Sequence, residues 1–147
     1  MPRYAFRYQE FMLEPCDAFP QGRVAKRPLL SVTLVAPDGR TFDTVACPDS
    51  GADHCVFPLK FAGELGLDVA SMKSALSTGV GNAENETWYA NITIKMDRGL
   101  EFEAYAGFTD GLDDVGYGLL GQEGFFNKYV VLFDHGDGEF CLYTKTL

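Results

Sequence analysis

Basic side chains are scarce in this chain, and it has neither a long apolar run nor a leader-like N-terminus. Its 12 Lys and Arg are outnumbered by 21 Asp and Glu, giving a formal net charge of -9 and a sequence pI near 4.5. Nucleic acid binding needs a basic patch, and the basic residues here are scattered, so no nucleic acid partner is expected. No apolar run approaches the roughly 18 residues that cross a bilayer, and the N-terminus lacks the apolar centre of a signal peptide. The sequence therefore predicts no membrane segment and a cytoplasmic protein.

Cysteine is also sparse. The four cysteines are too few and too irregularly spaced for a disulfide framework, so we expect reduced thiols that mostly pack in the core: Cys16, Cys47, Cys55 and Cys141. A metal site is one interpretation of four residues with ligand side chains: Cys47, Asp53, His54 and Cys55. The two cysteines are too far apart for a zinc knuckle and no second pair follows, so no metal is predicted.

The Gly-x-Gly-x-x-Gly letters of a dinucleotide site occur at residues 116–121. In that fingerprint a buried strand precedes the first glycine and a helix follows the last. Here Asp113 and Asp114 stand where the strand should be, and residues 122–126 do not open a convincing helix. No cofactor is predicted.

Short strands separated by turn residues make up most of the chain. With 147 residues, of which 46% are hydrophobic and 22% charged, the chain is long and apolar enough for one globular domain with a core. Alternating or β-branched segments joined by glycine-containing turns predict three hairpins, at 29–36 with 41–47, 88–96 with 100–108, and 129–134 with 139–144. The fold class predicted is all-β.

One short helix is expected after residue 58. Pro58 suits a first helical position, Phe61, Ala62 and Leu65 fall on one face, and Gly66 can close the C-terminus.

Residues 1–28 are expected to form one extra strand and then a loop. Tyr4, Phe6 and Tyr8 alternate as in a strand, whereas Pro15 and Pro20 interrupt the stretch after them.

Asp49-Ser50-Gly51 places one carboxylate on a tight turn between the strand-like stretches 44–48 and 54–58. About seventy residues later, Tyr-Gly-Leu-Leu-Gly at 117–121 is an apolar strand that stops at a glycine. A carboxylate on a glycine-containing turn is how aspartic peptidases present their catalytic aspartate. A turn residue before glycine is the alternative interpretation of Asp49.

The two motifs, in this order and at this spacing, resemble the retropepsin-like family of aspartic peptidases, the single-domain group that includes the retroviral proteases. The resemblance runs from about Leu30 to Tyr143. It implies a closed barrel of the acid peptidase type over residues 29–147, with the short helix after the catalytic loop, and makes residues 1–28 an extension.

Hydrolysis of a peptide bond by this route needs one carboxylate as general base and a second, protonated one as general acid. The chain has one Asp-Ser-Gly, so the second Asp49 must come from an identical chain, and a homodimer acting on a peptide or protein is predicted. Gly51 allows the tight turn. The resemblance implies that the Ser50 hydroxyl bonds across to the other chain.

The resemblance also implies a flap, a glycine-bearing hairpin that covers the substrate. Gly79, Val80 and Gly81 stand where its tip should be, and with Ala52 and Asp53 they are the expected substrate-binding residues. An ordinary polar loop is the alternative for this stretch. Retroviral enzymes pair an arginine with the aspartate matching Asp53; Gln122 stands at the arginine position, and its amide is expected to bond Asp53 instead.

Two other functions remain open from the sequence. The domain could serve as a retropepsin-like dimerisation or peptide-binding module with little or no catalysis. It could also be a metal- or ligand-binding β-barrel unrelated to peptidases. A thiol nucleophile is disfavoured because His54 and Cys55 are adjacent in a strand and point to opposite faces.

Overall fold

A computed structural model describes residues 2–78 and 84–145. The chain divides into two compact units, one of Leu30–Lys128 and one that joins Met1–Leu29 to Tyr129–Leu147.

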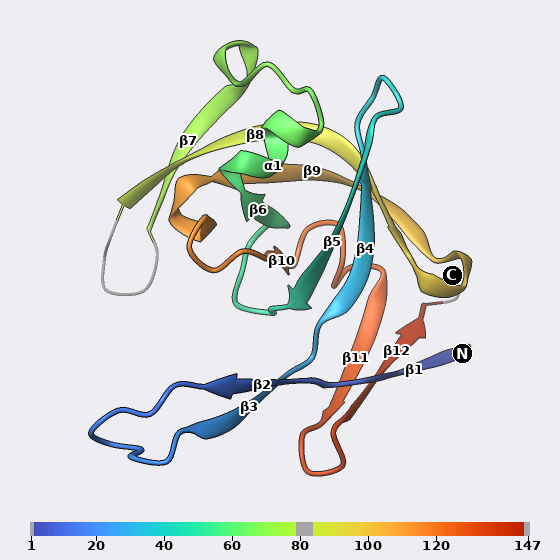
Figure 1. Ribbon diagram of the computed structural model, residues 1–147. Coiled ribbons are helices and arrows are strands. Elements are labelled where there is room, and N and C mark those ends of the chain that lie inside the picture. The colour runs from blue at the N-terminus through green and yellow to red at the C-terminus, as the bar shows by residue number, and fades with distance from the viewer. Residues whose placement is uncertain (1, 79–83, 146–147) are drawn as a thin grey trace. The chain divides into compact units, whose positions relative to one another are not determined.

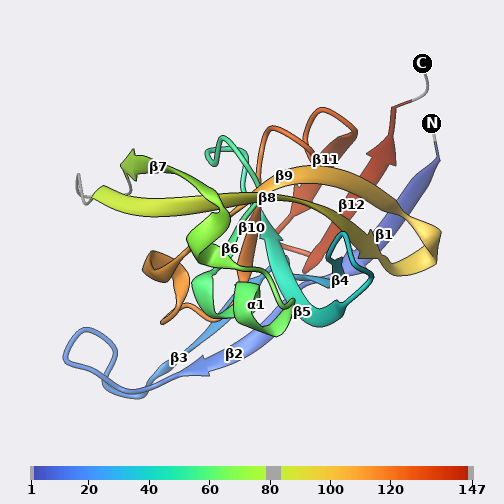
Figure 2. The ribbon, with the colours of Figure 1, turned by 90° about the horizontal axis from the view of Figure 1, so that it is seen from above.

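The first unit is a closed six-stranded barrel (Figure 1). Its strands follow one another around the barrel in this order: β4 (Leu30–Val35), β5 (Thr41–Pro48), β10 (Gly118–Leu120), β6 (Val56–Pro58), β9 (Glu101–Thr109) and β8 (Glu84–Met96). β8 pairs back with β4 and closes the ring. β7 (Lys73–Thr78) is added to β8 outside the ring, and Figure 2 shows these two strands running side by side away from the barrel. The all-β, closed-barrel prediction is confirmed.

Alternation along the strands fills the barrel. In β4 the side chains of Leu30, Val32 and Leu34 are buried, and β8 and β9 contribute inward residues in the same way: Ile92, Ile94, Met96, Phe102, Ala104 and Ala106. Burying a side chain of this size stabilises the fold by roughly 1.5–3 kcal/mol. The hairpins predicted at 29–36 with 41–47 and 88–96 with 100–108 are both present.

The predicted helix is α1 (Leu59–Glu64), with Pro58 as its N-cap, one position earlier than expected. Phe61, Ala62 and Leu65 are buried, and Gly66 ends the helix with a φ of 67° that suits glycine. The described part of this unit also contains three single turns of 3-10 helix: η1 (Val69–Ser71), η3 (Asp97–Gly99) and η4 (Asp110–Leu112). Among the described residues, no helix has the length and apolar character needed to cross a membrane.

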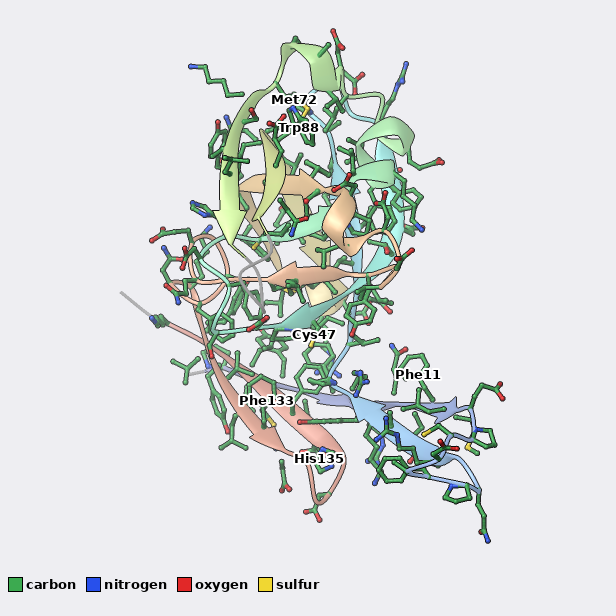
Figure 3. The ribbon with its side chains drawn as sticks, turned by 90° about the vertical axis from the view of Figure 1, so that its left-hand side faces the viewer. Phe11, Cys47, Met72, Trp88, Phe133 and His135 are labelled. Atoms are coloured by element: carbon green, nitrogen blue, oxygen red, sulfur yellow. The ribbon has the colours of Figure 1, made fainter. Side chains whose placement is uncertain are left out.

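The second unit contains two small antiparallel sheets. β1 (Arg3–Arg7), β12 (Glu139–Thr144) and β11 (Tyr129–Asp134) form one, in that order, so the predicted C-terminal hairpin is confirmed. β2 (Gln9–Leu13) and β3 (Arg23–Arg27) form the other, where Figure 3 labels Phe11. The expectation of one strand and a loop before residue 29 was therefore wrong. Three of the five residues of β3 are basic, which hides the apolar alternation on which the prediction depended.

Candidate active site

The turn at Asp49 is built where three barrel strands meet. β5 leads into it and β6 leads out of it, and β10 lies between the two, parallel to β5 and antiparallel to β6 (Figure 1). Leu119 is the centre of this arrangement, because it pairs with Cys47 on one side and with Val56 on the other. The loop of residues 49–55 therefore crosses the end of β10, a strand about seventy residues away in the chain.

Backbone hydrogen bonds fix the position and orientation of Asp49. Its N–H donates to the Leu120 carbonyl at 2.9 Å, which ties the start of the loop to β10. The Gly51 N–H donates to Oδ1 of Asp49 at 2.9 Å, and the Ala52 N–H donates to the Asp49 carbonyl at 3.1 Å. The half-buried carboxylate is thus oriented by its own loop.

The residues after β10 hold the rest of the loop. The N–H of Gln122 donates to the Ala52 carbonyl at 2.8 Å, and that of Glu123 donates to the Asp53 carbonyl at 2.9 Å. The Gln122 side-chain amide donates to the Ser50 carbonyl at 2.8 Å. The expected bond from this amide to Asp53 is not the one formed, because the backbone of Gln122 pairs with Ala52 and its side chain reaches towards Ser50.

Two glycines allow β10 and the residue after it to lie this close to the loop and to β6. A Cβ on Gly121 would meet the carbonyl oxygens of His54 and Ala52, the second at 2.6 Å. A Cβ on Gly118 would overlap the Phe57 ring. Glycine at both positions therefore lets β10 pack between β5 and β6 and against the loop.

The structure brings five of the expected site residues together in one loop: Asp49, Ser50, Gly51, Ala52 and Asp53. Asp49 and Ala52 are half-buried, and the other three are exposed. Gly79, Val80 and Gly81, the expected flap tip, lie outside the described residues. The strands on either side of them, β7 and β8, are paired up to Thr78 opposite Glu84, and Figure 3 shows Met72 and Trp88 at the other end of this hairpin.

An aromatic cluster beside the loop was missed by the sequence interpretation. The Tyr89 ring lies 5.5 Å from the His54 ring, edge to face, and stacks on Tyr105 with centroids 5.3 Å apart. Burial raises the pKa of the Tyr89 phenol, and the charges of Asp53 and Tyr105 raise it further. The sequence does hold a clue to this cluster, because the predicted alternation puts Tyr89 and Tyr105 at outward positions of the same hairpin.

Cys55 is fully buried and unsuited to nucleophilic chemistry. Burial raises the pKa of its thiol to about 11, so the reactive thiolate is a very small fraction at neutral pH. Cys141 is buried as well, whereas Cys47 is half-buried and Cys16 exposed. Among residues 2–78 and 84–145, no three His, Cys, Asp or Glu side chains converge as metal ligands.

The barrel, the turn that presents an aspartate and the strand threaded beneath it define an acid-protease type of fold. The chain is similar in structure to a retropepsin-like aspartic protease from Rickettsia conorii, with a TM-score of 0.53 over 97% of this chain and 95% of that one. Sequence identity between the two is 14%. No protein-family model and no curated protein sequence matches the chain. The chain therefore has the retropepsin-like aspartic protease fold.

Proposed function

We propose that this protein is an aspartic endopeptidase that hydrolyses peptide bonds in peptides or proteins. The observation that supports this best is the setting of Asp49, whose carboxylate is oriented by the Gly51 N–H on a loop anchored to β10. A group that must exchange protons with water and substrate at every turnover needs a fixed position, and this loop supplies it.

In the proposed mechanism, two copies of the chain each contribute one Asp49. The two carboxylates share one proton, because like charges in contact cannot both ionise cheaply. The ionised carboxylate takes a proton from water, which attacks the peptide carbonyl carbon, while the protonated one donates to the carbonyl oxygen. The C–N bond then breaks as the first carboxyl gives its proton to the leaving amine and the second takes a proton back from a hydroxyl of the adduct. The exposed Ser50 hydroxyl is available to bond to the loop of the second copy.

A dimerisation or peptide-binding module without catalysis is the second candidate. It is favoured by Gln122, whose neutral amide bonds the Ser50 carbonyl at the place where the retroviral family has an ion pair. A module of this kind would keep the fold and bind peptides without cleaving them.

Asp49→Asn separates the two candidates. An amide can neither act as the base nor share the proton, so cleavage of a peptide library should fall by roughly three orders of magnitude or more. Asp68→Asn is the matched control, since Asp68 is an exposed residue after α1 and outside the loop, and this variant should cleave as fast as the parent. Parent protein without any cleavage, or Asp49→Asn with undiminished cleavage, would refute the proposed function.

A further inference from the structure

Three rings from three separate elements form one cluster next to the catalytic loop. His54 belongs to the loop itself, Tyr89 to β8 and Tyr105 to β9. The two tyrosine rings are nearly parallel, at 22°, and the His54 ring meets Tyr89 at 72°. Tyr105 remains 46% exposed, so one side of the stack is open to solvent.

The cluster lies within reach of any peptide held at Asp49. Four residues lie between Asp49 and His54, and the five Cα-to-Cα steps that join the two can span at most about 18 Å. An extended peptide rises about 3.3 Å per residue. With the ring separations of 5.5 Å and 5.3 Å added to that span, Tyr105 is no more than about nine residues from a bond cleaved at Asp49. Gly107 fixes the arrangement, because it pairs with Val56 just after the loop and with Tyr89 on β8.

The electrostatic surroundings of the cluster favour a cation. Asp53 is exposed and its charge reaches Tyr89, and exposed Glu103 lies two residues before Tyr105 on the same face of β9. Lys73 of β7 is a base that pairs with Tyr89. The whole formal charge of -9 falls within residues 30–128, because the rest of the chain has equal numbers of acidic and basic side chains. The face of a tyrosine ring also attracts a cation, because the ring quadrupole makes that face negative.

We propose that the stacked rings of Tyr89 and Tyr105 bind a lysine or arginine side chain of the peptide substrate, and that Asp53, next to His54 in the chain, adds negative charge. This site would give the enzyme a preference for a basic residue within about nine positions of the cleaved bond. The proposal rests on the proposed function, and it names a substrate class for the same site. Tyr105 acts here as a specificity-determining residue and takes no part in the chemical step.

The test uses pairs of peptides that are identical except for arginine or its neutral isostere citrulline at one position near the cleaved bond. The parent protein should prefer the arginine peptide by about 3- to 30-fold in kcat/KM, the range that one cation–π contact accounts for. Tyr105→Leu and Tyr105→Thr, which remove the ring, should bring this ratio close to one through KM. Tyr105→Phe is the matched control, because it keeps the ring and should keep the preference.

Binding separates failure of this inference from failure of the proposed function. The Kd of the same peptides for Asp49→Asn is measurable whether or not the parent cleaves them, and the arginine peptide should bind more tightly. Combining Asp49→Asn with Tyr105→Leu should remove that difference. The inference is overturned if the parent shows no preference for arginine, or if folded Tyr105→Leu and Tyr105→Thr both retain it.

Discussion

The orientation of Asp49 depends on residues with no functional group of their own. Its carboxylate bonds to a backbone N–H within the loop, and the loop is held by backbone carbonyls that reach β10 and the residues after it. Such contacts require two stretches of backbone to approach closely, and a side chain at the crossing point would separate them. Gly121 is that crossing point.

Gly121→Ala is expected to lower the free energy of unfolding by at least about 2 kcal/mol, because its Cβ would meet the backbone oxygens of His54 and Ala52. Gly63→Ala is the matched control: Gly63 lies in α1, nothing lies within 4 Å of the added methyl group, and stability should rise by about 0.5–1 kcal/mol. Urea denaturation measures both values. Equal stability of Gly121→Ala and the parent would show that the loop is not held in this way.

At the scale of elements, the sequence predicts well the strands that pair with their neighbours in the chain. β4 with β5, β8 with β9 and β11 with β12 each show alternation and a turn residue between them, and all three hairpins are present. The placement of β10 between β5 and β6 could be reached only through the family resemblance. Its partner strands lie about seventy residues away in the chain, and β10 itself has only three residues, too few to show the alternation of a strand.

The cluster of Tyr89 and Tyr105 shows a different limit. Register within a predicted hairpin places both residues on the outward face, but the sequence does not tell which part of the barrel surface lies beside the loop. That depends on the pairing of β6 with β9, a parallel contact between strands that are not consecutive. The sequence therefore predicts the loop of the candidate site and leaves its surroundings undetermined.

The β7–β8 hairpin is the element that we expect to act as the flap, with its tip at Gly79, Val80 and Gly81. Replacing both glycines by proline should reduce kcat on the order of tenfold by restricting the backbone, while the melting temperature stays nearly constant because loop tips carry few buried contacts. The double alanine variant at the same positions is the milder control. Unchanged turnover in the proline variant would remove the flap assignment.

At the scale of the whole molecule, the proposed mechanism needs a second copy of the chain, because the sequence contains a single Asp-Ser-Gly. Two chains that each carry a formal charge of -9 repel one another. Salt weakens that repulsion, because at physiological ionic strength exposed charges more than about 8 Å apart are largely screened. We therefore expect pairing to be favoured by moderate salt, and activity per chain to fall when the protein is diluted.

Mixing parent protein with Asp49→Asn chains tests the central claim most directly, since it asks whether one active site uses Asp49 from two chains. At one part parent to nine parts variant, after subunits exchange at moderate salt, a parent chain meets another parent chain about one time in ten. The activity per parent chain should then fall to roughly a tenth. In the control mixture with nine parts of Asp68→Asn, which is itself active, the activity per total chain should equal that of the parent alone. Full activity per parent chain in the presence of excess Asp49→Asn would contradict the account.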